Sequence, residues 1–300
     1  MVRQSIVNFM CNFNYISFLF YILILFIPIN GNVIDYEMRG AIPNNSSLEV
    51  INKNREIMNN IFNNLSPNAH FYIPNKTFYI NGGIMASNLE SVKIQIDGTL
   101  MFSDSLYNWP HDINNNPLEC MHFSNIKNVL FTSKSRSNPG IINGQGQTWW
   151  GIPGIGYLIR GENRPRLLNI DGGSNITIEN LLFTNSPYWT VYIHGINGLI
   201  IRYSAVINRR TNQDKHTLID LTAFNTYGFD ITGKNVHIHD CNIWTQDDCI
   251  AVKGESSNML FERINASGLG LTIGSIGSEI VNNITFRDCY MHNTAKGIYI

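Results

Sequence analysis

An adjacent pair of aspartates, Asp247-Asp248, is the strongest candidate for chemistry in this 300-residue sequence. The pair lies in the segment QDDCIAV, an apolar run typical of a β-strand with few other charges. Two neighbouring carboxyl groups can act as general acid and general base, the minimum for hydrolysing a glycosidic bond. Without further context such a pair is more often a solvated turn, so the elements that would position it decide between the two interpretations.

The composition excludes some classes of partner. Charged residues make up 14% of the chain and apolar residues 44%, which suits a long all-β chain with a substantial core. The formal net charge of −1 gives no electrostatic attraction to nucleic acid or to an anionic membrane. We therefore expect neither as a partner, and we expect a monomer without a cofactor.

The amino terminus predicts secretion. Residues 16–29 form an uncharged apolar run after the basic Arg3, with Gly31 as a small residue for cleavage. An uncleaved anchor is the alternative, but the run is short for a spanning helix of about 20 residues. We predict a signal peptide over 1–31, a mature domain over 32–300 and no membrane association once the signal is removed. Seven sequons agree with a secreted glycoprotein, at Asn44, Asn45, Asn64, Asn75, Asn175, Asn265 and Asn283.

Cysteines and histidines carry little functional signal. Outside the predicted signal lie Cys120, Cys241, Cys249 and Cys289, which allow two disulfides or free thiols and fit no zinc or redox spacing. His237 and His239 share one face of a predicted strand and would suit a metal ion. Two outward-facing side chains are more often plain surface, so no metal site is predicted.

A short amphipathic helix is predicted near the start of the mature domain. Residues 48–66 carry apolar side chains at helical spacing, with Ser46 or Ser47 as the cap. From about Phe71 onward the pattern changes to short β-type runs bounded by Asn and Gly. The helix would therefore cover one end of a β-rich domain.

The short runs repeat. Apolar triplets that each follow an Asn or Gly begin at Val129, Ile176, Leu199, Val236, Met259 and Ile284. Val129 lies 47 residues before Ile176, which we interpret as two steps. From Ile176 on, the steps are 23, 37, 23 and 25 residues, and the long step contains a polar insert, 208–217, predicted to bulge out as a loop. A period in the low twenties without intervening helices indicates a β-solenoid. Leucine-rich repeats share the period but not this consensus, and a β-sandwich would need hairpin signals. We predict an all-β parallel β-helix with an N-terminal capping helix.

The repeat also predicts which residues meet. Counted from the first residue of its triplet, Asp247 is at +11 and Asp248 at +12. Leu269 is at +10 in the next coil, and Tyr299 at +15 in the one after. Neighbouring coils stack about 4.8 Å apart, so these residues should share one outer face, in a groove suited to an elongated substrate. Because adjacent strand residues face opposite sides, both aspartates reach the groove only if the chain bends there.

With these residues in view, the chain resembles glycoside hydrolase family 28, the polygalacturonases and related pectin-degrading enzymes, over roughly residues 70–300. The matching segments, in order, are IDGTLMFS, INGQGQTWW, RPRLLNI, NSPYWTVYI, FNTYGFDI, QDDCIAV and GLGLTIGSIG. The resemblance implies a right-handed β-helix and inverting hydrolysis of a pectin-like polysaccharide. It also implies that Asp247 protonates the leaving oxygen, while Asp248 helps hold and deprotonate the attacking water.

Three positions differ from the family pattern. In the family's Asn-Thr-Asp motif the acid is replaced here by Tyr227. In its Gly-His-Gly motif the imidazole is replaced by Leu269. In its Arg-Ile-Lys motif the guanidinium is replaced by Tyr299. The last motif runs into the end of the sequence, and we expect a C-terminally truncated chain. The missing arginine weighs against a polyuronate, whose carboxylate a bidentate cation would hold.

The remaining site residues are carried over by position. Asp230 would position water in place of the acid at 227, or else it is a turn residue bonded to nearby backbone N–H groups. Substrate binding is predicted for Asn225, Gln246, Lys253 and Gly270. Trp149, Trp150, Tyr188 and Trp189 would either stack on sugar rings or, more commonly, pack inside the protein.

Two functions therefore remain open from the sequence. The first is a secreted glycosidase acting on pectin or a related polysaccharide. The second is a catalytically impaired β-helix that binds glycans. The discriminating residue is Tyr227, because an enzyme of the usual mechanism needs a carboxylate there unless Asp230 replaces it.

Overall fold

A computed structural model describes residues 33–152 and 163–300 of the chain. The predicted signal peptide over 1–31 lies outside the described residues. The elements are β1 (Val33–Asp35), α1 (Leu48–Asn63), β2 (His70–Ile73), β3 (Thr77–Ile80), β4 (Ile84–Ser87), β5 (Lys93–Ile96), β6 (Thr99–Phe102), β7 (Met121–Lys127), β8 (Leu130–Thr132), β9 (Gly140–Asn143), η1 (Gly146–Thr148), β10 (Leu168–Glu179), β11 (Leu181–Thr184), β12 (Val191–Arg202), β13 (Ala205–Ile207), η2 (Asp220–Ala223), β14 (Phe229–Trp244), β15 (Asp248–Val252), β16 (Ser256–Ser267), β17 (Gly270–Ile273), β18 (Val281–Arg287), β19 (Tyr290–Met291) and β20 (Ile298–Tyr299).

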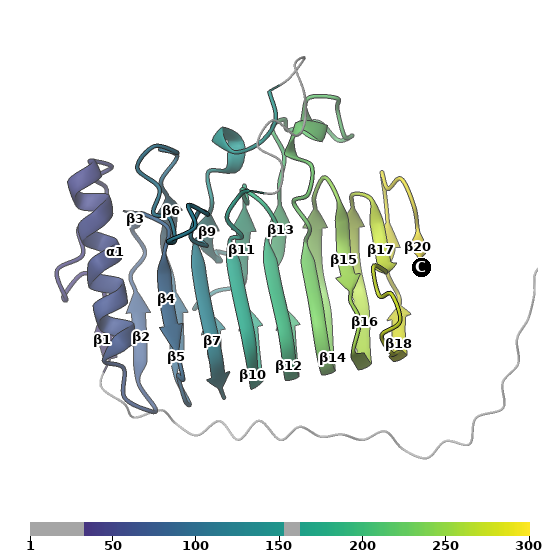
Figure 1. Ribbon diagram of the computed structural model, residues 1–300, viewed down its shortest axis with the longest axis horizontal. Coiled ribbons are helices and arrows are strands. Elements are labelled where there is room, and N and C mark those ends of the chain that lie inside the picture. The colour runs from purple at the N-terminus through teal and green to yellow at the C-terminus, as the bar shows by residue number, and fades with distance from the viewer. Residues whose placement is uncertain (1–32, 153–162) are drawn as a thin grey trace, which may run out of the picture.

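The strands stack as successive coils of a right-handed parallel β-helix, as the sequence predicted (Figure 1). The named strand pairings in the described residues are all parallel, and β10, β12, β14, β16 and β18 follow one another along the stack. The register joins the first residues of the predicted triplets in one column: Ile176, Leu199, Val236, Met259 and Ile284. From Ile176 on, the period read from the sequence is therefore the coil of the solenoid. The interpretation of the 47 residues from Val129 to Ile176 as two steps is wrong, because Leu130 pairs directly with Thr177 and the stretch forms one coil.

The core is a set of apolar columns inside the coils. One column runs through Ile178, Ile201, Ile238 and Phe261, which are essentially unexposed. Phe261 then stacks on Phe286 of the next coil, with ring centroids 5.0 Å apart. Burying each such side chain stabilises the fold by roughly 1.5–3 kcal/mol. Since the triplets alternate inward and outward, the same register that builds this core also fixes which residues face outward.

Asparagines form a ladder at the corner that precedes the triplets, except before Leu199, where Gly198 takes that place. Asn128, Asn175, Asn235, Asn258 and Asn283 all have φ between 50° and 58°, a left-handed conformation that asparagine tolerates well. The Asn175 amide donates to Asn128 Oδ1 (3.1 Å), and the Asn283 amide donates to Asn258 Oδ1 (2.8 Å). Three of the seven sequons, Asn175, Asn265 and Asn283, therefore use their amide nitrogens to tie one coil to the next.

Helix α1 covers the N-terminal end of the stack, confirming the predicted capping helix (Figure 1). Ser47 is its N-cap, and its hydroxyl accepts from the backbone N–H of Val50. The buried face of the helix includes Met58 and Phe62, and the Phe62 ring meets Phe71 edge-on at 5.2 Å. The helix thus shields the apolar columns at that end. Within the described residues, no helix is long and apolar enough to cross a membrane.

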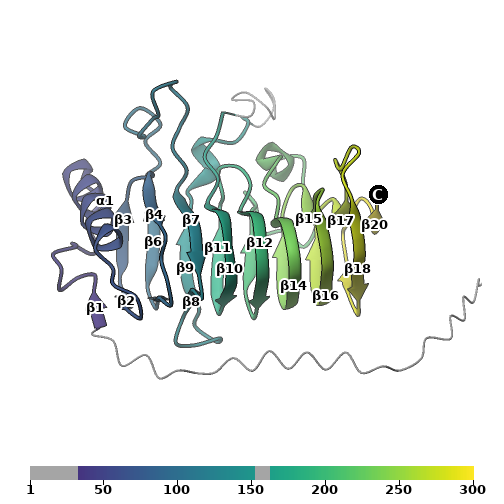
Figure 2. The same ribbon diagram turned by 60° about the horizontal axis from the view of Figure 1, so that its bottom comes forward.

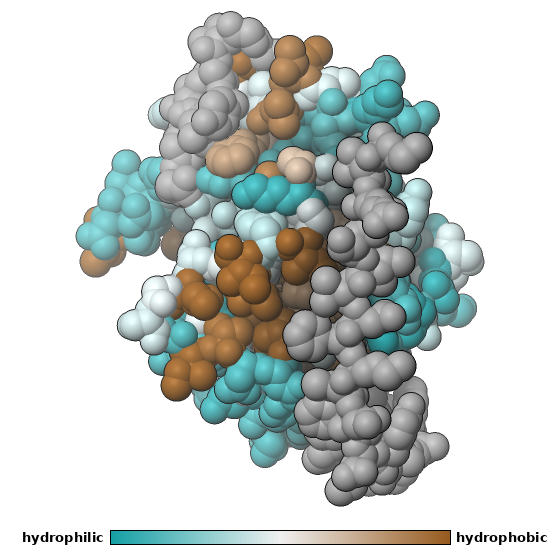
Figure 3. Space-filling view, turned by 90° about the vertical axis from the view of Figure 1, so that its right-hand side faces the viewer, coloured by the Kyte–Doolittle hydropathy of each residue, from teal (hydrophilic) through white to brown (hydrophobic). Residues whose placement is uncertain are grey.

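The opposite end of the stack presents an apolar patch (Figure 3). The exposed apolar side chains of the last coils are Ile280, Tyr290, Ile298 and Ile300. Figure 2 shows that the loops after β6 and β13 leave the stack on one side. The second of these contains the insert 208–217, which is the loop that the sequence predicted.

The four described cysteines are free. Cys120, Cys241 and Cys249 are buried, and Cys289 is partly buried. Of the two alternatives left open by the sequence, the structure has the free thiols.

Candidate active site

The aspartate pair lies at a bend between β14 and β15. Asp247 precedes β15, and Asp248 is the first residue of β15. The register between β15 and β17 shifts just after Asp248. The backbone N–H of Asp248 donates to Asp247 Oδ1 at 2.9 Å, and the two residues are 3% and 5% exposed. The bend that the sequence required for two adjacent aspartates to serve one site is therefore present.

The next two coils bring the predicted neighbours to this bend. The backbone N–H of Leu269 donates to the Asp247 carbonyl at 2.8 Å, and the phenol of Tyr299 donates to Asp248 Oδ1. Gly270 pairs with Asp248 across the coils. Its φ is +154°, and a Cβ there would lie 2.7 Å from the Gly297 carbonyl oxygen, so glycine is required by close backbone approach. The grouping inferred from the repeat is confirmed.

Asp230 is the third carboxylate of this region and lies inside β14. Its side chain is fully buried, and neither carboxyl oxygen has a hydrogen-bond partner among the described residues. The Lys253 ammonium is 3.8 Å from its Oδ2. The alternative that Asp230 is a turn residue bonded to backbone N–H groups is therefore wrong. Burial raises its pKa to about 7, against the opposing effects of Lys253 and Arg166.

The two aspartates of the pair differ in their surroundings. Burial, reinforced by the negative charge of Asp248, raises the pKa of Asp247 to about 7. Burial also raises the pKa of Asp248, but the hydrogen bond from Tyr299 and the charges of Lys253 and Lys296 oppose that rise. Asp247 Oδ2 is buried without a hydrogen-bond partner among the described residues. The arrangement favours a protonated Asp247 beside an ionised Asp248, which is a division of roles between acid and base.

Tyr227 lies in a row of stacked aromatic rings. Its ring is 5.5 Å from Trp189 with the planes 7° apart, and Trp189 stacks in turn on Tyr188 at 4.9 Å. The Lys253 ammonium lies 5.3 Å from the centroid of the Tyr227 ring. Burial, with the nearby aspartates, raises the pKa of the Tyr227 phenol, so it stays neutral. The row fills the place where the resemblance expected a carboxylate.

Two cations of the site were not among the predicted site residues, although one of them, Arg166, lies in the matching segment RPRLLNI. Arg166 lies over Trp189 and Tyr192, 4.6 Å from each ring centroid, and pairs with Glu119 at 2.6 Å. The Lys296 ammonium lies 4.1 Å from the ring centroid of Tyr299. The segment RPRLLNI could have indicated Arg166, whereas only the register between coils could have indicated Lys296.

The predicted substrate-binding residues have different surroundings. Lys253 stands between Asp230 and the Tyr227 ring, inside the acidic cluster. Asn225 is buried, and its backbone N–H bonds to the Asp247 carboxylate. Gln246 is also buried: its amide donates to the Asn208 carbonyl at 3.0 Å, and its oxygen faces His216 at 2.9 Å. The Gln246 side chain is thus engaged within the protein in this conformation.

The other aromatic and histidine candidates are accounted for by packing. Trp149 and Trp150 are buried, as the packing alternative predicted. His237 faces Glu262 at 3.0 Å, and His239 faces Asp240 at 2.6 Å. Across residues 33–152 and 163–300, no three His, Cys, Asp or Glu side chains gather in a way that could hold a metal ion.

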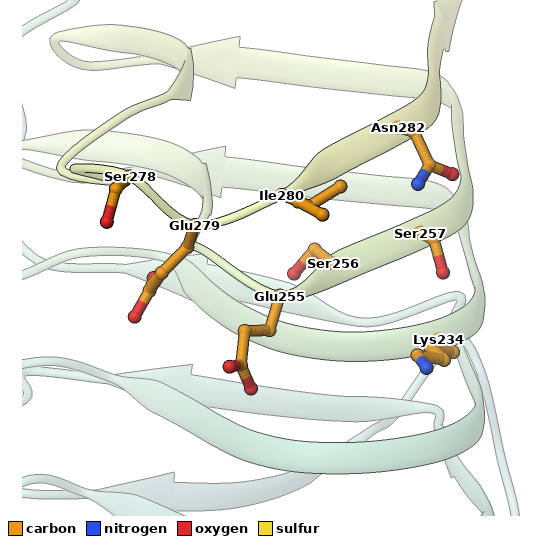
Figure 4. A pocket seen from close by; sticks show the side chains of 8 residues that line it. All are labelled: Lys234, Glu255, Ser256, Ser257, Ser278, Glu279, Ile280 and Asn282. Atoms are coloured by element: carbon orange, nitrogen blue, oxygen red, sulfur yellow. The ribbon is translucent and has the colours of Figure 1, made fainter.

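A hollow of about 650 Å³ lies beside the turns that follow β15 and β17 (Figure 4). It is lined by Lys234, Glu255, Ser256, Ser257, Ser278, Glu279, Ile280 and Asn282. Glu255, Ser278, Glu279 and Ile280 come from the turns that follow β15 and β17, and the other four residues belong to β14, β16 and β18. Asp248 and Gly270 stand at the opposite ends of β15 and β17, as their first residues. The hollow is therefore separate from the acidic cluster.

Sequence comparisons relate the chain to pectin-degrading enzymes. The profile of Glycosyl hydrolases family 28 matches residues 66–300. The chain is 29% identical over 218 residues to an endopolygalacturonase of Emericella nidulans, covering 71% of this chain and 53% of that protein. It is 28% identical over 214 residues to a polygalacturonase of Chamaecyparis obtusa, covering 68% of this chain and 37% of that protein. The chain thus spans about half the length, or less, of these relatives.

Solved structures share the fold. The endo-xylogalacturonan hydrolase of Aspergillus tubingensis superposes with a TM-score of 0.71 at 23% identity, over 89% of this chain and 67% of that one. The exopolygalacturonase of Thermotoga maritima superposes with a TM-score of 0.67 at 17% identity, over 89% and 68%. At these identities the likeness concerns the fold alone. With the profile matched from residue 66 to residue 300, the chain belongs to glycosyl hydrolase family 28.

Proposed function

We propose that this protein hydrolyses glycosidic bonds in pectin or a related polysaccharide, with inversion at the anomeric carbon. One observation carries the proposal: two adjacent buried aspartates, of which one is favoured as the neutral acid and the other as the carboxylate. An inverting glycosidase needs a protonated carboxyl on the leaving oxygen and a carboxylate that activates water.

Each carboxyl has a role that follows from its surroundings. Asp247, with a pKa raised to about 7, donates its proton to the leaving glycosidic oxygen. Asp248, whose ionised form is stabilised by the Tyr299 phenol, holds the attacking water and accepts its proton. Asp230 sits deeper, 3.8 Å from the Lys253 ammonium, and its ionised form would balance that cation beside the aspartate pair.

The substrate class rests on the relatives and on the cations around the acids. The relatives are polygalacturonases, and Lys253 and Lys296 lie close enough to act on the charge of Asp248. Tyr299 in place of a guanidinium argues for a substrate less acidic than a pure polyuronate. Three of the predicted binding residues adjoin the acids: the Asn225 N–H bonds to Asp247, Gly270 pairs with Asp248, and the Lys253 ammonium is 3.8 Å from Asp230 Oδ2. We also propose that the protein is secreted, glycosylated and monomeric.

A glycan-binding protein without catalysis is the second candidate, and Tyr227 favours it. Its ring is stacked on Trp189 and its phenol stays neutral, so it supplies no third carboxylate. The two candidates differ in one measurable quantity, the release of reducing ends.

The test is reducing-sugar release from pectins of different methylation, xylogalacturonan and neutral polysaccharides, with the chain and its Asp247→Asn variant. The hydrolase predicts release by the unaltered chain and a loss of at least 100-fold in the variant. The stereochemistry of the first product, followed by NMR, distinguishes inversion from retention. Retained polysaccharide binding with no release from any substrate would establish the second candidate. Release that is unaffected by Asp247→Asn would remove the acid role from Asp247.

A further inference from the structure

The insert 208–217 is tied to the body of the protein rather than projecting freely. Asp220, almost fully buried, accepts hydrogen bonds from the backbone of Arg210 and Thr211 at 2.8 Å and from both threonine hydroxyls, Thr211 and Thr217, at 2.7 Å. These bonds close the loop around one carboxylate. The conformation of the segment just before Asp220 is therefore set by the loop itself.

His216 projects from this closed loop onto the coil that carries the aspartates. Its Nδ1 is 2.9 Å from Gln246 Oε1, and its Nε2 is 2.9 Å from Ser267 Oγ. The ring also stacks on Trp244, with centroids 4.7 Å apart and planes 28° apart. One imidazole thus joins the turn before β15 to the turn before β17.

The hydrogen-bond network fixes the tautomer of this histidine. The Gln246 amide nitrogen donates to the Asn208 carbonyl, so its oxygen is the atom that accepts from His216. Nδ1 therefore carries the proton, and Nε2 accepts from the Ser267 hydroxyl. Burial lowers the pKa of His216, and the charged and titratable groups around it are Asp220, His292 and Arg209. The ring is neutral at pH 7, as this network requires.

Both partners of His216 lie next to Asp247 along the chain or across the coils. Gln246 immediately precedes it, and Ser267 begins the turn whose Leu269 N–H bonds to the Asp247 carbonyl at 2.8 Å. We propose that His216 is a positioning residue, which holds Asp247 in place by clamping these two turns together. The residue acts through Gln246 and Ser267 and has no direct contact with the reacting atoms.

The inference rests on the proposed hydrolysis, so its test has one readout in activity and one that is independent of activity. His216→Phe keeps a flat ring on Trp244 but removes both hydrogen bonds. Ser267→Ala removes one partner and leaves the histidine. Asn293→Ala is the matched control, because Asn293 also ties the insert to the stack, through the Asp214 carbonyl at 2.7 Å, without touching the aspartate bend.

For His216→Phe we expect kcat to fall by roughly 10- to 100-fold with KM within about twofold, since misplacing a reacting group by about 1 Å costs about that much. Ser267→Ala should lose roughly three- to tenfold, and Asn293→Ala should keep the original kcat. Hydrogen exchange should accelerate at residues 245–249 and 267–270 in His216→Phe, with global unfolding unchanged.

A kcat within twofold of the original in both His216→Phe and Ser267→Ala would overturn the inference. So would unchanged exchange at 245–249. If the unaltered chain releases no sugar, the proposed function fails by that result alone. The exchange data then still decide whether His216 orders the bend. If His216→Phe fails to fold, both kcat and hydrogen exchange are measured on Ser267→Ala instead.

Discussion

Replacing the buried acid should make the protein more stable at neutral pH while removing its activity. The pKa of Asp247 is raised from 3.8 to about 7, mainly by burial. Each unit by which a pKa is shifted corresponds to about 1.4 kcal/mol, so ionised Asp247 lowers the free energy of unfolding by at most about 4 kcal/mol above pH 7. Asn has similar size and no charge, so Asp247→Asn removes that cost.

The sign of the effect fixes its dependence on pH. The folded state holds this proton more tightly than the unfolded state, so the stability contributed by protonated Asp247 is complete below pH 3.8 and lost as pH rises through about 7. Asp247→Asn should therefore gain roughly 2–4 kcal/mol at pH 8 and almost nothing at pH 4. For a chain of this size, that gain in the free energy of unfolding corresponds to a rise in the thermal unfolding midpoint, Tm, of roughly 5–15 °C.

The assay is urea unfolding of both proteins at several pH values from 4 to 8, followed by tryptophan fluorescence and circular dichroism. The exposed Asp214 supplies the matched control, because Asp214→Asn makes the same chemical change without burial. A difference between Asp247→Asn and the original chain that is the same at pH 4 and pH 8 would refute the raised pKa. The basis for the acid role of Asp247 would fall with it.

Three further predictions follow from named contacts. Tyr299→Phe removes the hydrogen bond that favours ionised Asp248, so the pKa of Asp248 rises further. The acidic limb of the pH profile of kcat/KM should therefore move up by about one pH unit. An unchanged acidic limb would contradict the assignment of Asp248 as the base. Phe261→Ala, at a fully buried core position, should cost about 3–5 kcal/mol in urea unfolding, and a cost below about 1 kcal/mol would mean that the column repacks. Gly270→Ala should cost roughly 1–3 kcal/mol and most of the activity, because its Cβ would press on the Gly297 carbonyl; thermal unfolding and sugar release together would show whether that clash is real.

The fold was predictable from the sequence because a solenoid repeats one local pattern. The steps between triplets gave the register, and the structure pairs Val236 with Met259 and Met259 with Ile284 as that register requires. The same count brought Tyr299 to Asp248 across two coils. Stacked coils convert sequence period directly into spatial neighbours, so long-range contacts become readable.

The site was less predictable where it depends on loops and on depth of burial. Arg166 and His216 reach the site from loops of irregular length, whose paths carry no period. Asp230 looked equally like a turn residue, because its burial depends on the packing of the neighbouring coils. Gln246 matched a substrate-binding position, yet its carboxamide is bonded to Asn208 and His216. Side-chain engagement of this kind follows from packing that no linear spacing encodes.

The asparagine ladder has a consequence for how such a chain can change over generations. Each rung fixes where a coil begins, so the distance between rungs measures the length of everything in between. From Asn235 to Asn258 and from Asn258 to Asn283 that length hardly varies, yet the coil before Asn235 holds an insert without disturbing the rung. The extra length of that coil thus lies in the loop that carries His216 to Gln246, while the Asn235 amide still donates to Asn197 and holds the frame. A coil of this stack can therefore carry additional residues beside the acids without unsettling the coils beneath.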